Sequence, residues 1–142
     1  MEIVPFKAEH LRALSLQDAQ AYLDGMITEA DAQALEAQDI AYTGLVDGRP
    51  IVCAGIIVQW VGRAIAWAYL SREAGQHMPA IHRAVKRMFG ALDIPRIEAH
   101  VTAGFEPGHR WVRMLGFKLE TPEPMRKFLT TGEDAYLYAR IR

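Results

Sequence analysis

The sequence predicts one domain of the α+β class over residues 1–142, with the element order ααβββαβαββ. Three observations support this prediction. Residues 1–38 have helical patterns, residues 40–70 hold alternating apolar runs separated by tight-turn residues, and helical and extended patterns alternate after residue 70. The composition, 51% apolar and 23% charged, is that of a folded chain with one core, and it excludes disordered, collagen-like and disulfide-rich proteins.

Two capping signals predict helices in the amino-terminal region. In Ser15-Leu-Gln-Asp18 and in Thr28-Glu-Ala-Asp31, a hydroxyl is followed three residues later by an acid. This spacing lets the two side chains satisfy free backbone amides at a helix start. We expect Gly25 to end the first of these helices and the second to run to about Gln38. An earlier helical turn or two covers residues 7–14.

Three antiparallel strands are expected next, over residues 40–46, 50–60 and 64–70. Asp47-Gly48 separates the first two, and this dipeptide tolerates the positive φ values that a tight hairpin turn requires. Residues 61–63 turn the chain into the third strand. We interpret the single cysteine, Cys53 in the second strand, as a small buried hydrophobic residue without chemistry.

Residues 78–92 have the pattern of an amphipathic helix, with Pro79 in its first turn. Its other face carries Arg83, Lys86 and Arg87, which could attract a phosphate group or simply be solvated. Because a helical crossover joins parallel strands, we expect residues 64–70 and 96–102 to be parallel neighbours.

The carboxy-terminal part continues with a strand over residues 96–102 that has one polar side. A second helix covers residues 107–115 and ends at Gly116, which can take the left-handed conformation that follows a helix. Two last strands are expected over residues 117–121 and 135–141.

Charge is unevenly divided along the chain. Residues 1–62 carry three basic and nine acidic side chains, whereas residues 63–142 carry thirteen basic and eight acidic ones, so the two parts have net charges of −6 and +5. This division fits either a solubilising surface with a dipole or an anionic ligand or acidic partner. The basic residues do not build a recognised nucleic-acid module.

Several function classes are excluded by the absence of their signals. The longest apolar run stops at Gln59, far short of the ~20 residues of a membrane span. Residues 1–6 lack the pattern of a secretory signal, so we expect synthesis in the cytoplasm. No zinc-binding spacing of Cys and His and no Gly-x-Ser-x-Gly elbow is present, so we expect no metal.

The element order, together with Trp111-Val-Arg-Met-Leu-Gly-Phe117, resembles the GCN5-related N-acetyltransferase (GNAT) superfamily, in which the last helix commonly ends in a Leu-Gly-Phe turn. The resemblance covers most of the chain and implies a mixed, mostly antiparallel sheet of about six to seven strands with helices on both faces. Residues 98–101 and 108–117 also resemble the acetyltransferase-like proteins of bacteriophages, which include an internal virion protein of short-tailed phages.

The superfamily implies acetyl-CoA as cofactor, held by a loop of pattern Arg/Gln-x-x-Gly-x-Gly/Ala whose backbone amides bind the pyrophosphate at a helix start. The corresponding residues are Arg72-Glu-Ala-Gly75-Gln76-His77. Arg72 and Gly75 fit the pattern. His77 replaces its small last residue, and Pro79 lacks an amide donor soon after, so the match is partial.

A proton acceptor for the amine and an acid for the departing thiolate are the second requirement that the resemblance implies. In many members the acid is a tyrosine five residues before the Phe of the Leu-Gly-Phe turn, where this chain has Val112. For the base, the polar side of one strand offers Glu98 and His100, and the last strand offers Tyr136 and Tyr138. We expect His100 to be the base, with Glu98 as the second candidate. Positioning alone can supply much of the catalysis where no acid is present.

Two functions from different classes follow. The first is a virion or ejection-associated component of a phage with eroded catalytic motifs, which would be made in the cytoplasm of a bacterial host, contact other virion proteins or copies of itself, and end in the virion. The alternative is an acetyl-CoA-dependent N-acetyltransferase acting on a small-molecule or protein amine.

Overall fold

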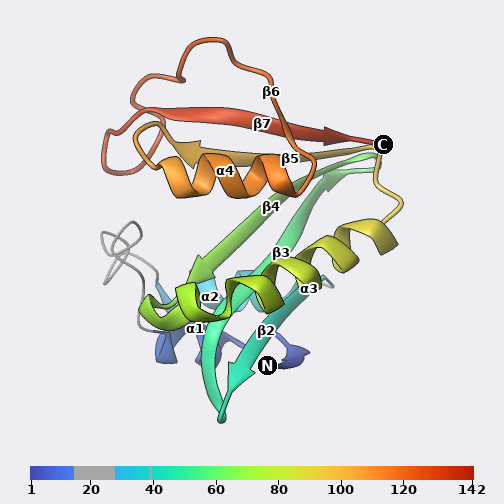
Figure 1. Ribbon diagram of the computed structural model, residues 1–142, viewed down its shortest axis with the longest axis vertical. Coiled ribbons are helices and arrows are strands. Elements are labelled where there is room, and N and C mark those ends of the chain that lie inside the picture. Colours follow the sequence, from blue (N-terminus) through green and yellow to red (C-terminus); the bar gives the residue numbers. More distant parts are fainter. Residues whose placement is uncertain (15–27, 39) are drawn as a thin grey trace. The chain divides into compact units, whose positions relative to one another are not determined.

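The strands of the protein form one mixed sheet in the computed structural model, which describes residues 1–14, 28–38 and 40–142 (Figure 1). Their order in the sheet is β1-β2-β3-β4-β5-β7-β6. The strands are β1 (Glu2–Pro5), β2 (Ala41–Val46), β3 (Arg49–Trp60), β4 (Arg63–Leu70), β5 (Arg96–Thr102), β6 (Lys118–Leu119) and β7 (Ala135–Ile141). The helices are α1 (Ala8–Ala13), α2 (Glu29–Glu36), α3 (Met78–Ala91) and α4 (Glu106–Met114), with a 3-10 helix, η2 (Arg72–His77).

The predicted mixed sheet is confirmed. β1 with β2, β2 with β3, β5 with β7 and β6 with β7 pair antiparallel. β4 and β5 are parallel, as predicted, with Arg63 opposite Arg96 and Ile65 opposite Glu98. A parallel pair needs a long crossover, and η2 and α3 provide it.

Three elements differ from the prediction. β1 was not expected, and it pairs with β2 through Glu2–Pro5 at one edge of the sheet. β6 is shorter than expected because only Lys118 and Leu119 pair with β7. The segment Arg72–His77, expected as a loop, is the 3-10 helix η2. The predicted helix from Ser15 to Gly25 lies outside the described residues.

The turns and the helix cap that single residues or short motifs predict are confirmed. Asp47 and Gly48, between β2 and β3, have φ values of 50° and 77°, and Gly116, after α4, has a φ of 94°. At the start of α2, the Thr28 hydroxyl accepts a hydrogen bond from the Asp31 N–H over 3.1 Å. The Thr28 N–H in turn donates to the Asp31 carboxylate over 2.9 Å. These are the two reciprocal bonds that the capping spacing predicts.

The chain divides into two compact units, each built from two stretches of sequence. Unit 1 consists of residues 1–57 and 67–84, and unit 2 of residues 58–66 and 85–142. The prediction of one domain over residues 1–142 stays a prediction.

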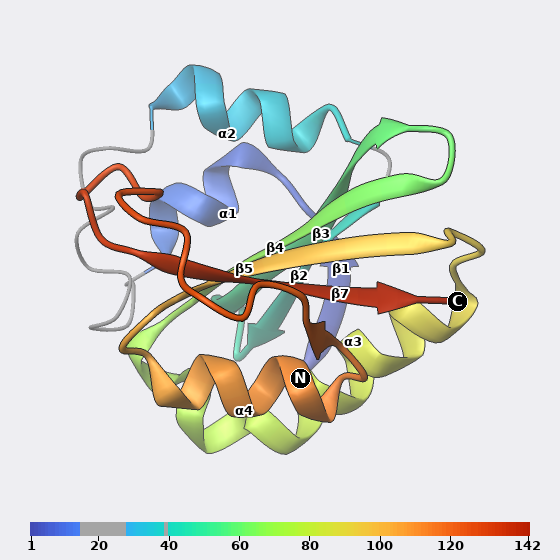
Figure 2. The same ribbon diagram turned by 90° about the horizontal axis from the view of Figure 1, so that it is seen from above.

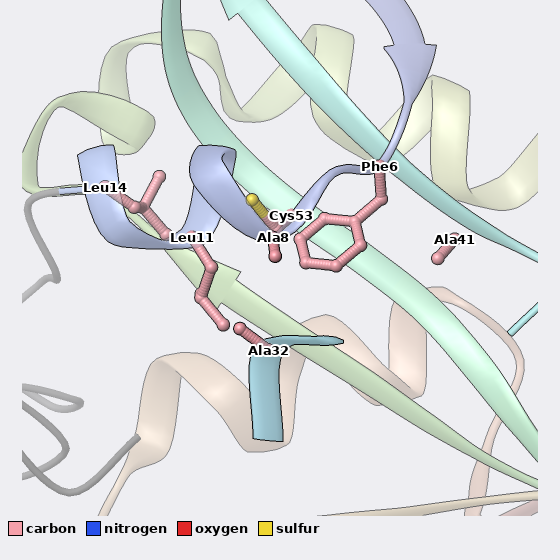
Figure 3. Packing of buried hydrophobic residues seen from close by; sticks show 7 residues of the cluster. All are labelled: Phe6, Ala8, Leu11, Leu14, Ala32, Ala41 and Cys53. Atoms are coloured by element: carbon pink, nitrogen blue, oxygen red, sulfur yellow. The ribbon is translucent and has the colours of Figure 1, made fainter. Parts of the chain in front are cut away.

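The core of unit 1 lies between α1, α2 and the strands (Figure 3). Its buried members are Phe6, Ala8, Leu11, Leu14, Ala32, Ala41 and Cys53, with Leu35, Trp67 and Tyr69 packed against them. The Phe6 and Trp67 rings meet edge to face, with centroids 5.4 Å apart. Burial raises the pKa of the Cys53 thiol to about 11, so this cysteine is an unreactive core residue at neutral pH. In this unit, α1 and α2 cover one face of the strands and the first half of α3 covers the other (Figure 2).

The core of unit 2 lies on one face of β5 and β7. Ile97 and Tyr138 are almost wholly buried there. Phe89 of α3 contacts Phe117, which follows α4, with ring centroids 5.4 Å apart. Within this core, the second half of α3 therefore contacts the segment that follows α4. Among the described residues, no helix combines the length and apolar character that crossing a membrane requires.

Candidate functional site

The two candidate catalytic residues lie on the same face of β5. Side chains alternate along a strand, so Ile97, Ala99 and Val101 point into the core of unit 2 while Glu98 and His100 point to the opposite face. Their surroundings differ sharply. Glu98 is 4% exposed, whereas His100 is exposed.

Glu98 is held by two arginines. Arg63 of β4 donates two hydrogen bonds to its carboxylate, over 2.6 and 2.9 Å. Arg96 of β5 donates a third over 2.7 Å. The hydrogen bonds from Arg63, supported by those from Arg96, lower the pKa of Glu98 to about 2. A carboxylate this acidic is poorly suited to take a proton from an amine at neutral pH.

The arginines extend this ion-pair network on the same face. Arg96 also binds the carboxylate of Glu120, and one of these bonds measures 3.1 Å. The guanidinium group of Arg63 lies over the ring of Trp60, 4.7 Å from its centroid. Each charged group of the network thus has a partner of opposite charge.

His100 has a different environment. Its imidazole meets the ring of Phe128 edge to face, with centroids 4.7 Å apart. Desolvation by the surrounding protein lowers the pKa of His100 below its ordinary value, and the positive charge of Arg63 acts in the same direction. The negative charge of Glu98 opposes both. An exposed imidazole with a lowered pKa is neutral at pH 7 and can accept a proton.

A second histidine of unit 2 is buried in a hydrogen-bond network. His109 of α4 is 4% exposed, and its Nε2 lies 3.0 and 2.9 Å from the carbonyl oxygens of Thr102 and Ala103. Nε2 must therefore carry the proton, because carbonyl oxygens only accept. His109 Nδ1 then accepts the hydroxyl proton of Tyr138 over 2.7 Å. This network fixes α4 to the end of β5 and to β7.

The network also bears on the acid expected in a GNAT enzyme. Val112, at the position where many relatives have tyrosine, is 8% exposed and packs in the core of unit 2. Tyr138 is 1% exposed, and its hydroxyl donates to His109. Tyr136 is half-buried and contacts the His109 ring at 5.7 Å. Val112 has no acidic proton, and the proton of Tyr138 is donated to His109. Tyr136 is opposite Val101 in the register of β5 and β7, so it lies on the other face of the strands from His100.

The candidate cofactor residues belong to unit 1, and η2 brings them together in consecutive turns. Gly75 and Gln76 are exposed, Arg72 is exposed, and His77 is half-buried. A Cβ atom added at Gly75 would meet no atom within 4 Å, so open space lies beside it.

The residue that precedes η2 has an unused polar atom. Ser71 is 3% exposed, and its Oγ is buried without a hydrogen-bond partner among the described residues. The Ser71 carbonyl accepts the Ala74 N–H over 3.1 Å, so that amide is not free. The open space beside Gly75 would admit a phosphate group, whereas the Ser71 hydroxyl is buried. The bond to the Ala74 N–H leaves fewer free backbone amides than the superfamily pattern provides.

The other candidate side chains of the described residues form no site. Arg83, Lys86 and Arg87 of α3 are exposed, as the sequence predicts. In residues 1–14, 28–38 and 40–142, no cluster of three or more His, Cys, Asp or Glu side chains is arranged to hold a metal ion.

Comparison with known proteins identifies the fold. No protein-family model matches the sequence, and no curated protein does. Solved structures do match. Ard1 from Thermoplasma volcanium is 16% identical with a TM-score of 0.79, covering 99% of this chain and 96% of that one. A GNAT-family acetyltransferase from Bacillus anthracis is 18% identical with a TM-score of 0.68, covering 98% and 93%. The ribosomal-protein-S18-alanine N-acetyltransferase from Escherichia coli is 16% identical with a TM-score of 0.69, covering 99% and 92%.

The chain has the GNAT fold. This confirms the fold that the resemblance implied, including its mixed sheet with helices on both faces. The three GNAT-fold structures named above are described as acetyltransferases or as Ard1, and none supports the expected virion component.

Sequence reasoning missed the residues that surround the two candidates. The sequence analysis places Arg63 in a turn and Arg96 at the start of a strand without a contact for either, and it assigns no element to the residues around Phe128. A signal existed for Arg96, since Arg96 and Glu98 are two residues apart in one strand and so share a face. No comparable signal existed for Phe128, because no local pattern says where a loop side chain packs.

Proposed function

We propose that the protein is an acetyl-CoA-dependent N-acetyltransferase that acts on a small-molecule or protein amine. The GNAT fold supports this proposal, and the observation that carries it is His100. An exposed imidazole with a lowered pKa, on the polar face of β5, is the kind of group that accepts a proton near neutral pH.

Each candidate residue receives one role. Arg72, Gly75, Gln76 and His77 of η2 would hold the pyrophosphate of acetyl-CoA, through amides and side chains at the start of the crossover. When bound, acetyl-CoA supplies the acetyl group as a thioester. His100 would accept the proton that the substrate nitrogen loses as its bond to the acetyl carbon forms.

Glu98 receives a supporting role. Its low pKa and its three hydrogen bonds from Arg63 and Arg96 make it an anchor for β4 and β5 and leave it a weak base. It also places a negative charge on the face that carries His100. We therefore rank His100 above Glu98 as the proton acceptor.

The virion or ejection-associated role gains no observation in its favour. It rested on a resemblance of residues 98–101 and 108–117 and on the imperfect cofactor and acid positions. The same imperfections are compatible with an enzyme, since positioning of an amine against a thioester supplies much of the rate enhancement. Contacts with virion proteins or with further copies of the chain stay predictions.

The proposal is tested by the release of free CoA thiol from acetyl-CoA in the presence of a panel of small amines and peptides. We expect amine-dependent thiol release by the wild-type protein, and a fall of roughly 10²-fold or more in kcat/KM for His100→Gln, the size typical of a lost general base. His82→Gln is the matched control, because it changes a half-buried histidine of α3 outside the proposed machinery. Amine-dependent release that is equal in His100→Gln and wild type would remove His100 from the mechanism, and no release with any amine would count against the enzyme.

A further inference from the structure

Phe128 is an exposed aromatic residue with a specific neighbour. It lies between β6 and β7, it is 46% exposed, and its ring contacts the His100 imidazole at 4.7 Å with an angle of 63° between the ring planes. Single exposed apolar side chains are common on protein surfaces, so the exposure of Phe128 is not informative by itself. The informative feature is its ring contact with the His100 imidazole.

The loop that carries Phe128 is closed by hydrogen bonds on both sides. Met125 and Ala135 exchange two backbone bonds, of 2.7 and 3.1 Å. Nearer the tip, the Leu129 N–H donates to the Glu133 carbonyl over 3.0 Å. Phe128 is thus held between paired segments of a short hairpin.

The residue before Phe128 has an unusual backbone. Lys127 has a φ of 52°, a left-handed conformation that residues other than glycine seldom adopt. Its N–H donates to the Asp134 carboxylate over 3.0 Å, which holds this conformation in place. Lys127 lies in a turn, as Asp47 does, so this conformation sets the direction in which the chain continues to Phe128.

We propose that the loop from Met125 to Ala135 holds the Phe128 ring against His100, so that Phe128 is a positioning residue for the imidazole. The inference rests on the proposed role of His100 as proton acceptor. The ring limits the orientations open to the imidazole and displaces water from one side of it. His100 is thereby kept neutral and aligned by an apolar ring contact, which does not itself occupy the lone pair of the imidazole.

The charged groups near His100 do not account for its neutral state in the way that the Phe128 contact does. Glu98 of β5 favours the charged imidazole and Arg63 of β4 disfavours it, while Leu137, opposite His100 on β7, carries no charge. Glu98 is itself neutralised by Arg63 and Arg96. Desolvation is accordingly the largest influence on the pKa of His100, and Phe128 is the aromatic ring that contacts it.

The test follows the His100 signal by NMR through a pH titration, with the signal assigned by its loss in His100→Gln. In Phe128→Ala we expect the midpoint to move upward, because water regains access to the charged imidazole. Phe128→Tyr keeps the ring and should titrate like wild type. Leu119→Ala is the matched control, since Leu119 is 44% exposed on β6 and should leave the midpoint unchanged.

The kinetic counterpart is the dependence of kcat/KM on pH. The acid limb of Phe128→Ala should move to higher pH together with the NMR midpoint, and the two profiles should converge at alkaline pH. An unchanged NMR midpoint in Phe128→Ala, or an equal shift in Leu119→Ala, would overturn the inference. If the midpoint moves but His100→Gln keeps full activity, the contact stands and the role of His100 in catalysis fails.

Discussion

Glu98 and Arg63 are joined by two parallel hydrogen bonds, of 2.6 and 2.9 Å, across the parallel strands β5 and β4. The side chain of Glu98 is 5% exposed and that of Arg63 is 28% exposed. A forked pair of this kind combines charge with fixed geometry and is stronger than an ordinary surface ion pair.

Replacing Glu98 by Gln should destabilise the fold, because it leaves two half-buried guanidinium groups without their shared anion. We expect a loss of about 2 kcal/mol in the free energy of unfolding at pH 7, measured by urea denaturation. Glu120→Gln is the matched control. It changes a more exposed partner of Arg96 and should lower the free energy by less than about 1 kcal/mol. Equal losses in the two variants would contradict a special role for the Glu98 pair.

The same pair should make stability depend on pH. The pKa of Glu98 is about 2 in the folded protein, against an ordinary value of 4.5, so the folded state favours the ionised form. This stabilisation is fully present above the ordinary value and is lost as the pH falls toward 2. Between pH 5 and about 2.5, the free energy of unfolding should therefore fall more steeply for wild type than for Glu98→Gln. Parallel curves for the two proteins would show that Glu98 titrates normally.

Removing the hydroxyl of Tyr138 should leave a buried acceptor without a partner. Tyr138→Phe keeps the aromatic ring and removes only the hydroxyl, so His109 Nδ1 loses the hydrogen bond of 2.7 Å. The expected loss is about 1–3 kcal/mol in the free energy of unfolding. Tyr136→Phe, in which the ring contact with His109 is kept, should change stability by less than about 0.5 kcal/mol. Thermal or urea unfolding of the two variants measures both losses, and equal losses would contradict the prediction.

Gly55 lies where a larger residue has no room. A Cβ atom added there would come within 2.4 Å of the Ile40 carbonyl oxygen and 2.8 Å of the Ala41 Cα, both backbone atoms. Gly55→Ala should lower the free energy of unfolding by about 1–3 kcal/mol. Gly104→Ala, where the new Cβ would meet nothing within 4 Å, should be neutral or slightly stabilising. Unchanged thermal stability of Gly55→Ala would mean that β2 and β3 can separate there.

Acetyl-CoA should raise the melting temperature if η2 binds it. A ligand at 100 times its Kd adds about 2.7 kcal/mol of stability. For a chain of this size that corresponds to a shift of roughly 5 °C or more. Gly75→Trp should abolish the shift by filling the open space beside η2, whereas Gly90→Trp, on the exposed side of α3, should retain it. A shift that survives in Gly75→Trp would place the cofactor elsewhere.

The parts of the fold that the sequence predicts well are those in which one residue carries the signal. Asp47-Gly48 and Gly116 adopt the positive φ values that their residue types favour. The pairing of β4 with β5 followed from the rule that a helical crossover joins parallel strands. These are local or topological rules, and neither depends on knowing the side-chain packing.

The parts that could not be predicted depend on contacts between distant residues. β1 has only four residues, and its strand conformation comes from pairing with β2. His109 lies on α4 with no nearby sequence feature that points to Tyr138, which reaches it from β7. The candidate base His100 could be named from the polar side of its strand, but its cover by Phe128 could not, since the position of a loop side chain is set by tertiary structure.

The interleaving of the two units bears on how the chain folds as the ribosome makes it. Unit 1 has all its residues once Ala84 has been synthesised, whereas residues 58–66 already belong to unit 2, whose remaining residues start at Val85. Until Arg96 and the rest of β5 emerge, Arg63 and Ile65 of β4 lack their parallel partners. The nascent protein therefore carries an unpaired strand edge next to exposed Trp60 and Val61 during this interval. Residues 63–65 of β4 can therefore complete their pairing only after β5 has left the ribosome.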